Sequence, residues 1–395
     1  MSPCMNARER FLASMHFEPC DHPPYWEWAY WVEAIQRWYE EGLPCKCGLP
    51  PDIQPMDSVS GDAGAWRPGS FRDQDVHTVL NLDEGIVHLP VHGTLRLPTP
   101  PVVVEEDDDT QVVIDENGIR KRVLKRSMSM PHFLEFPITC RRDWEEMRAN
   151  LNPSFSARVP ANWSELITSY RERTFPTALG GYPEGLFGGL RWLMGAERLL
   201  VTFYDDPELI HDILSCQTEL WLNLWEEVLA KLDVDCVHFW EDMCFRSGPL
   251  ISPTMFREFL SPYFKRLTDF LRGRGIDIIL VDTDGDCSLL IPLFLEAGVT
   301  GLYPFEVQAG MNVEEIGQQY PALQIMGGID KRALALGPEA IDQELERRLP
   351  SLLRRGGYIP TVDHHVPHDV SWPNFAYYRQ RVAEMCERLS PTVSR

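Results

Sequence analysis

Short apolar runs alternate with longer amphipathic segments over the last two thirds of the chain. Residues 234–240, 277–281 and 358–361 are short, apolar and rich in β-branched or aromatic side chains, which predicts buried strands. Between them, apolar residues recur at helical spacing, and the longest such segment, residues 207–232, begins with a proline directly after Asp206. Repeated strand–helix units predict a parallel sheet. At 395 residues, the α/β fold that fits best is a (β/α)8 TIM barrel.

The first third of the chain has a different pattern. Residues 102–104, 111–114 and 121–125 alternate apolar and polar positions and are separated by an acidic turn and an Asn-Gly turn, which predicts a β-meander. We therefore expect one barrel domain over residues 1–395, with a β-rich insertion around residues 85–140. The predicted roles of this insertion are a lid, the contact of a homodimer, or a structural flap.

Polar clusters follow three of the predicted strands at their carboxyl ends. In parallel α/β proteins this edge of the sheet is where active sites are built. Carboxylates and imidazoles that converge there predict either a metal site or an acid–base site. The residues in these clusters are Glu241, Asp242, Asp282, Asp284, Asp286, His364, His365 and His368.

Each of these residues also has a structural interpretation. Asp282 and Asp284 have the composition of a turn that caps the following helix. His364 and His365 are adjacent, so they point to opposite sides of an extended segment. We therefore expect only His364 to face the site, with a neutral structural histidine as the alternative.

Aromatic side chains gather in the predicted first strand, residues 24–29, and just beyond it. Trp26, Trp28 and Tyr30 share one face of that strand, where they are either core or the wall of a pocket for a flat or cationic substrate. Lys331 either neutralises a substrate carboxylate or begins a helix. The candidate substrate-binding residues are Trp26, Glu27, Trp28, Tyr182, Trp240, Asp242 and Lys331.

Composition narrows the classes of partner. The net charge of −22 disfavours nucleic acid and anionic membranes as partners. No apolar leader or membrane-spanning run is evident, so we expect a soluble, cytoplasmic protein that acts on a small molecule. The ten cysteines are scattered, which is typical of reduced, buried thiols.

Several motifs, in order along the chain, resemble the uroporphyrinogen decarboxylase superfamily over almost the whole length. The resemblance implies the same barrel fold. The segments that carry it are Met5–Phe11 with Phe17-Glu18-Pro19 and Asp21–Pro24, Gly248–Pro253 with Phe256 and Pro262-Tyr263, Asp284-Gly285-Asp286, Gly327–Asp330 and Gly356-Gly357-Tyr358.

The resemblance implies one of two chemistries. True uroporphyrinogen decarboxylases need no cofactor and hold the carboxylates of a tetrapyrrole with an arginine-rich segment after the first strand. This chain has aromatic residues and Glu27 over residues 25–31, where those arginines would stand. Eight carboxylates require cationic partners with fork geometry, so the departure argues against porphyrinogen decarboxylation.

The other branch of the superfamily consists of methyltransferases that work with corrinoid proteins. Its coenzyme M members bind zinc through a His-x-Cys pair after a late strand and a cysteine after the last strand. Those positions resemble Asp282, Asp284 and His364 here. The resemblance thus implies a divalent metal, zinc first, with Glu241 or Asp242 as a fourth ligand. Carboxylate and imidazole ligands would make the metal a stronger Lewis acid, suited to an oxygen-bearing methyl donor.

Three hypotheses follow. The first is a metal-dependent methyltransferase that activates a methyl ether or similar donor for a separate corrinoid protein, with catalysis by Asp284, His364 and Glu241. The second is a cofactor-free decarboxylase of a smaller aromatic acid, in which Asp284 and His364 transfer protons. The third is a barrel without activity that binds a tetrapyrrole or corrinoid, because a shared fold does not fix chemistry.

Overall fold

The centre of the molecule is a curled parallel sheet. The computed structural model describes residues 5–389 except residues 52, 55–56, 61–70 and 126–130. Seven strands follow the order β15-β14-β13-β12-β9-β8-β3, and every neighbouring pair is parallel. They are β3 (Val87–His88), β8 (Thr177–Gly180), β9 (Cys236–Trp240), β12 (Ile279–Thr283), β13 (Gly301–Pro304), β14 (Gln324–Met326) and β15 (Tyr358–Ile359).

The amino-terminal segment adds an eighth position beside the last strand. Strand β1 (Ala29–Trp31) runs parallel to the chain after β15 through a bridge between Tyr30 and Val366. The Val366 N–H donates to the Ala29 carbonyl at 2.8 Å. On its other side β1 pairs antiparallel with β2 (Ser58–Ser60). Eight parallel positions with helical connections confirm the predicted (β/α)8 TIM barrel.

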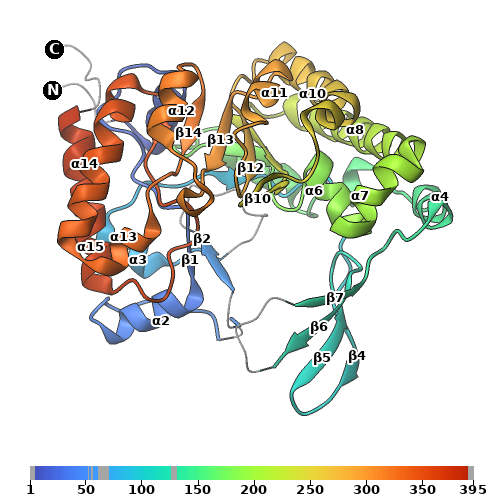
Figure 1. Cartoon of the computed structure of the whole chain (residues 1–395), viewed down its shortest axis with the longest axis horizontal. Helices are drawn as coiled ribbons and strands as arrows, with labels where there is room; N and C mark the ends of the chain where they lie inside the picture. The colour runs from blue at the N-terminus through green and yellow to red at the C-terminus, as the bar shows by residue number, and fades with distance from the viewer. Residues whose placement is uncertain (1–4, 52, 55–56, 61–70, 126–130, 390–395) are drawn as a thin grey trace.

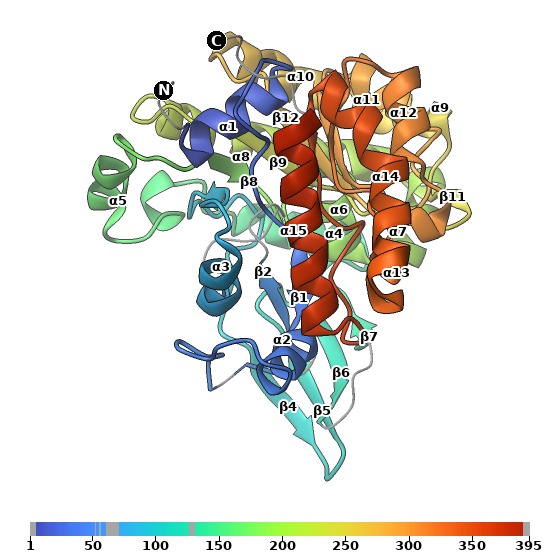
Figure 2. The same cartoon turned by 90° about the vertical axis from the view of Figure 1, so that its left-hand side faces the viewer.

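Helices surround the sheet, as Figures 1 and 2 show. Their apolar faces pack on the strands and leave the strand ends open. The helices are α1 (Ala7–Met15), α2 (Val32–Glu40), α3 (Gln74–Leu80), α4 (Arg141–Ala149), α5 (Trp163–Tyr170), α6 (Leu186–Met194), α7 (Ala196–Asp205), α8 (Pro207–Leu229), α9 (Pro253–Met255), α10 (Ser261–Gly273), α11 (Ile291–Glu296), α12 (Val313–Gln319), α13 (Lys331–Leu336), α14 (Pro338–Arg355) and α15 (Trp372–Leu389).

One of two predicted helix features is found in the structure. Helix α8 starts with Pro207 at its first position, and the Asp206 side chain accepts from the Leu209 N–H at 3.1 Å. The sequence also predicts a kink at Pro262 within one long helix. The structure instead has a π-helical turn, Phe256–Leu260, directly before α10. Pro262 lies in the first turn of α10, where its missing N–H costs least.

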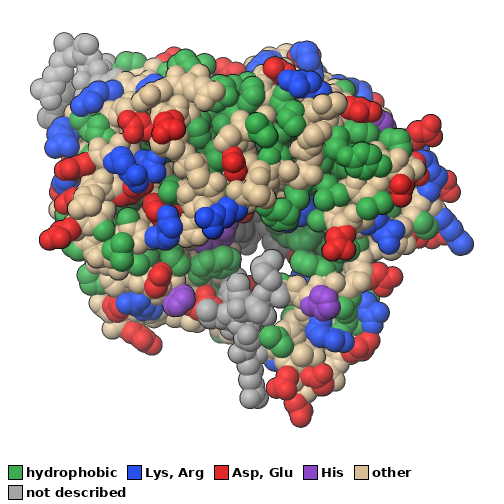
Figure 3. Space-filling view, viewed as in Figure 1, with side chains coloured by type: hydrophobic (Ala, Val, Ile, Leu, Met, Phe, Trp, Pro, Cys, Tyr) green, Lys and Arg blue, Asp and Glu red, His purple; other side chains and the backbone are tan. Residues whose placement is uncertain are grey.

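A four-stranded antiparallel sheet projects from the barrel (Figures 1 and 2). Acidic side chains gather at its far tip, where residues 105–109 turn (Figure 3). This sheet spans fewer residues than the insertion predicted over residues 85–140, because β3 at residues 87–88 belongs to the barrel sheet. Its strands are β4 (Val102–Glu106), β5 (Thr110–Ile114), β6 (Arg120–Leu124) and β7 (His132–Glu135).

The first barrel strand begins later than predicted. Residues 24–29 were expected to form it, whereas β1 starts at Ala29. The side chain of Glu27 accepts from the Trp28 N–H at 2.8 Å and thereby replaces a ladder hydrogen bond. Among the described helices, none has the length and apolarity needed to cross a membrane.

Candidate active site

A cavity of about 200 Å³ opens at the carboxyl ends of the barrel strands. Its walls come from the segments that follow β8, β9, β12 and β15 and from the segment that leads into β1. Three rings, three carboxylates and two imidazoles meet there. The lining residues are Trp28, Tyr182, Trp240, Asp242, Asp282, Asp284, His364 and His365.

Asp282 and Asp284 share the cavity face of β12 and its extension. Side chains alternate along a strand, so the intervening Thr283 points away from the cavity. Asp282 is only 8% exposed, and the described residues offer its carboxylate no hydrogen bond or ion pair. Burial and the negative charges of Asp284 and Asp242 raise the Asp282 pKa well above its ordinary value.

Asp284 pairs with His364 across the cavity. Their closest atoms, Asp284 Oδ2 and His364 Nε2, are 3.5 Å apart. Burial disfavours the charged forms of both side chains, but the attraction between the two charges outweighs this effect. The pKa of Asp284 is lowered by His364, Lys331 and Arg191, and the pKa of His364 is raised by Asp284. The arrangement favours an imidazolium beside a carboxylate.

Asp242 is held in position by Arg191 of α6. Asp242 Oδ2 lies 2.6 Å from Arg191 Nη2, and Arg191 also donates to the Asp242 carbonyl. The φ of Asp242 is 37°, a backbone conformation that non-glycine residues rarely adopt. The Arg191 guanidinium lies 5.7 Å from the ring centroid of Trp240, within range of a cation–π contact.

Glu241, a predicted metal ligand and catalytic residue, does not reach the cavity. It is fully buried and accepts from the N–H groups of Leu186, Phe187 and Gly188 at 2.8, 2.6 and 3.1 Å. Burial raises its pKa to about 7, although these three donors oppose the shift. Glu241 thus anchors the first turn of α6, because that turn has unpaired N–H groups.

Three predicted substrate-binding residues also lie outside the cavity. Trp26 is core: it packs on Phe11, and its indole N–H donates to the Glu84 carbonyl at 3.0 Å. Lys331 Nζ lies 3.7 Å from the buried Asp363. Glu27 is fully buried, accepts from the N–H groups of Trp28 and Val362, and pairs with Arg379 at 3.3 Å.

His365 lines the cavity although only His364 was expected there. The segment after β15 is not a regular strand, so neighbouring side chains do not alternate. His365 stacks on Trp31 with ring centroids 4.1 Å apart, and its Nε2 lies 2.7 Å from Ser58 Oγ. Its Nδ1 is 2.9 Å from His364 Nδ1. The sequence carries no signal for this irregular turn.

A buried polar chain lies beneath the cavity and was not predicted. Tyr303 packs against Trp28 at 4.8 Å, and its hydroxyl is 3.0 Å from His238 Nδ1. His88 Nε2 is 3.1 Å from the same nitrogen. Burial lowers the pKa of His88 to about 3 and that of His238 well below its ordinary value, so both rings are neutral.

The donor atoms around the cavity match the predicted metal centre in chemistry but not in arrangement. Carboxylates and an imidazole suit a divalent ion chemically. As the side chains stand, however, no group of three His, Cys, Asp or Glu in the described part of the chain is arranged to hold one. Asp242 is paired with Arg191, Asp284 with His364, and Glu241 with backbone amides. This arrangement does not fit a four-ligand centre, and zinc stays a prediction.

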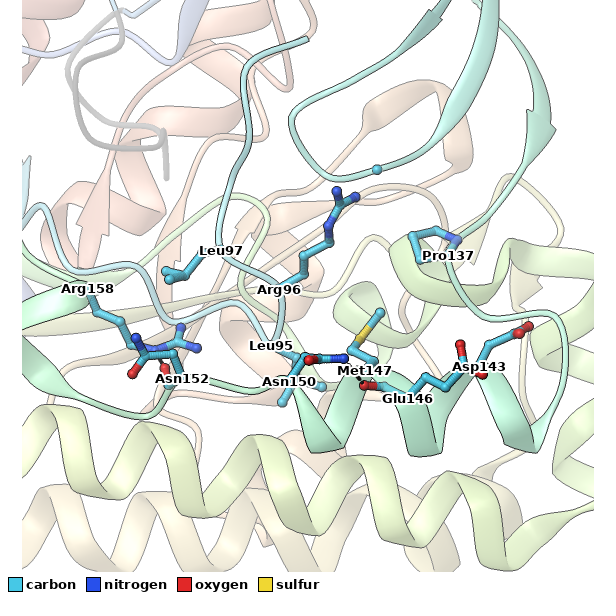
Figure 4. A pocket seen from close by; sticks show the side chains of 11 residues that line it. Leu95, Arg96, Leu97, Pro137, Asp143, Glu146, Met147, Asn150, Asn152 and Arg158 are labelled. Carbon is cyan, nitrogen blue, oxygen red and sulfur yellow. Dashed lines mark hydrogen bonds between the residues drawn. The ribbon is translucent and has the colours of Figure 1, made fainter. Parts of the chain in front are cut away.

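A larger cavity, of about 440 Å³, lies away from the barrel mouth, beside α4 and the projecting sheet (Figure 4). Its buried arginine, Arg158, donates to the carbonyls of Asn152, His92 and Thr94. These bonds tie loops together, so Arg158 has a structural role.

Comparison with known proteins places the barrel in a family. A family model described as uroporphyrinogen decarboxylase matches residues 129–385. The chain belongs to the uroporphyrinogen decarboxylase family. Among solved structures, this family member is similar to a methyltransferase from Methanosarcina mazei, with a TM-score of 0.57 and 14% sequence identity. The likeness covers 96% of this chain and 98% of that one, and it extends the shared fold to the whole barrel. A search of curated proteins gives no match.

Proposed function

We propose that this protein is a methyltransferase that takes a methyl group from a small donor in the barrel cavity and passes it to a Co(I) corrinoid on a separate protein. The observation that carries the proposal is the cavity itself: three aromatic rings beside a carboxylate–imidazole cluster, in about 200 Å³. Such a site suits a small, largely apolar group with a polar leaving atom. A methyltransferase with this fold along its whole length supports the proposal.

The same cavity is unsuited to a porphyrinogen. Among the residues that the structure describes, its lining includes three carboxylates and no arginine or lysine. The segment over residues 25–31, which leads into the cavity at Trp28, contains no arginine either. A tetrapyrrole with many carboxylates would be repelled here, because anions of this kind require arginine partners.

The residues that line the cavity have different roles in the proposed reaction. Trp28, Tyr182 and Trp240 enclose the donor and exclude water. With an oxygen donor, the bond between the methyl carbon and oxygen breaks, and the electron pair stays on oxygen. His364, kept charged by Asp284, then supplies the proton that the leaving oxygen needs. Elemental mass spectrometry of the purified protein checks the predicted zinc.

The test is methyl transfer to cob(I)alamin, followed by the loss of Co(I) absorbance, with an aryl methyl ether, methanol and a quaternary ammonium ion as donors. We expect transfer from at least one donor. If that donor is an oxygen compound, His364→Gln should lower kcat by about 10²-fold or more, because a general acid contributes about 10²–10⁴-fold. With an ammonium donor the same variant should change kcat little, because a neutral amine leaves without a proton.

Asp286→Asn is the matched control, because Asp286 lies two residues after Asp284 but outside the cavity and binds Ser288 instead. Absence of transfer from all three donors would overturn the proposal. Release of CO2 from a small aromatic acid, lost in the His364→Gln variant, would establish the decarboxylase alternative. The 3.5 Å Asp284–His364 pair would then serve as its proton-transfer pair.

A further inference from the structure

The charges around the cavity do not balance. Asp242 is matched by Arg191, and Asp284 by His364. Lys331, a further cation near the cavity, pairs with Asp363 at 3.7 Å. Glu306 accepts from the Gly285 N–H at 2.9 Å. Asp242, Asp284 and Lys331 therefore each have a partner of opposite charge, and Glu306 has a backbone donor.

Asp282 is the exception. It lines the cavity, is more than nine-tenths buried, and has no hydrogen-bond or ion-pair partner among the described residues. Its charged neighbours Asp284, Asp242 and Glu306 are all acidic. Burying a charged carboxylate without a partner is costly, and the described residues place no cation in contact with Asp282.

Aromatic side chains form part of the wall beside Asp282, and one of them, Trp240, also stacks on Trp192 and contacts Arg191. Trp28, Tyr182 and Trp240 line the cavity with Asp282. Tyr182 and Trp240 meet at nearly a right angle, 80°, with centroids 4.9 Å apart, which makes a corner between two rings. A cation within about 6 Å of such faces is attracted by the ring quadrupoles, and several rings around one cation form an aromatic cage.

The geometry favours an organic cation over a bare ion. A divalent metal needs several donor atoms that converge on one point, and its ligands are carboxylates, imidazoles and water. Here the carboxylates other than Asp282 are already paired, and much of the wall is aromatic. An alkylated ammonium group needs apolar walls and one acidic group that no other residue engages, and this cavity of about 200 Å³ has both among its described residues.

We propose that the cavity binds a quaternary ammonium group, with Asp282 as its counter-charge and Trp28, Tyr182 and Trp240 as its walls. This inference rests on the proposed methyl-transfer function and names the class of donor. In the transfer, one carbon–nitrogen bond breaks and its electron pair stays on nitrogen as a neutral tertiary amine. The methyl carbon forms its new bond with the electron pair of the Co(I) corrinoid, which is thereby oxidised to methyl-Co(III).

The experiment is isothermal titration calorimetry with choline and with its neutral carbon analogue, in which a carbon atom replaces the nitrogen. The two probes have the same shape and differ in charge. We expect choline to bind about ten-fold more tightly or better, because cation–π and charge contacts apply only to it. Asp282→Asn should weaken choline binding by about ten-fold and leave the analogue unchanged, whereas Asp286→Asn should alter neither.

Binding is measured without turnover, so the two proposals fail separately. Choline binding without methyl transfer from any donor would overturn the function and leave the cation site standing. Equal affinity for choline and its analogue, or methyl transfer from a neutral ether with no binding of choline, would overturn the cation site. Stoichiometric Zn²⁺ binding that is lost in Asp282→Asn and blocks choline would replace it with a metal site.

Discussion

At the scale of single residues, neighbours in the chain have opposite roles at the strand ends. Trp240 and Asp242 line the cavity, while Glu241 between them turns outward to α6. Trp28 lines the cavity, while Glu27 before it is buried against Arg379. In both cases neighbouring side chains face opposite sides, although only Trp240 lies within a regular strand. The sequence identified these clusters, but alternation applied strictly would have removed Glu241 and Glu27 from the candidates.

The neutral histidine pair beneath the cavity should make the folded protein less stable in acid. The pKa of His88 is lowered from 6.5 to about 3 in the folded protein. At pH values between these two, His88 is protonated in the unfolded chain and neutral in the folded protein. Its contribution to stability is therefore present above pH 6.5 and is lost as the pH falls toward 3. At about pH 5 the loss amounts to about 2 kcal/mol relative to about pH 7.5.

The measurement is urea unfolding at both pH values for the parent protein and for His88→Asn. The variant keeps an amide donor for His238 but does not titrate. We expect its free energy of unfolding to fall by about 2 kcal/mol less between the two pH values. An equal fall in both proteins would show that His88 does not carry this pH dependence.

At the scale of elements, the position of α6 against the end of β9 shapes the cavity. A Cβ atom on Gly188 would lie 2.1 Å from the Trp240 carbonyl oxygen, and one on Gly185 would lie 1.8 Å from it. Only glycine permits this approach. It brings the first turn of α6 to Glu241 and sets Arg191, one turn later, against Trp240 and Asp242.

Two adjacent glycines of α6 give a matched test of this packing. Gly188→Ala should destabilise the protein by about 1–3 kcal/mol, because the new methyl group overlaps a backbone atom that cannot move freely. Gly189 has no atom within 4 Å of the added Cβ, so Gly189→Ala should stabilise the helix by about 0.5–1 kcal/mol. Thermal unfolding of the two variants measures both. Equal effects would contradict the close-approach argument.

At the scale of the whole molecule, the sequence predicts the barrel better than its closure. Strand–helix repetition gave the parallel sheet, and strand-end clusters gave the cavity residues Asp282, Asp284 and His364. Closure and pairing depend on contacts between distant segments, which a local pattern does not record. The bridge from Tyr30 to Val366 and the placement of His365 are of this kind. So is the partnership of Arg191 with Asp242, which left Asp282 as the unmatched carboxylate.

A buried ion pair between Glu27 and Arg379 stabilises this closure. Glu27 joins three distant parts of the chain: its carboxylate accepts from the Val362 N–H at 2.8 Å and pairs with Arg379 of α15 at 3.3 Å. Both side chains are almost fully buried. Removing one partner leaves an uncompensated buried charge, so Arg379→Met should destabilise the protein by about 3–5 kcal/mol.

Replacing both partners should cost less than replacing one, because no charge is then left alone. Arg379→Met combined with Glu27→Gln is therefore expected to recover about 1 kcal/mol or more of the loss in urea unfolding, since Gln can still accept from Val362. Strictly additive losses would mean that the two charges do not interact. Because Glu27 directly precedes Trp28, we also expect Arg379→Met to weaken choline binding and the double variant to recover part of it, which would link the closure of the barrel to the shape of its cavity.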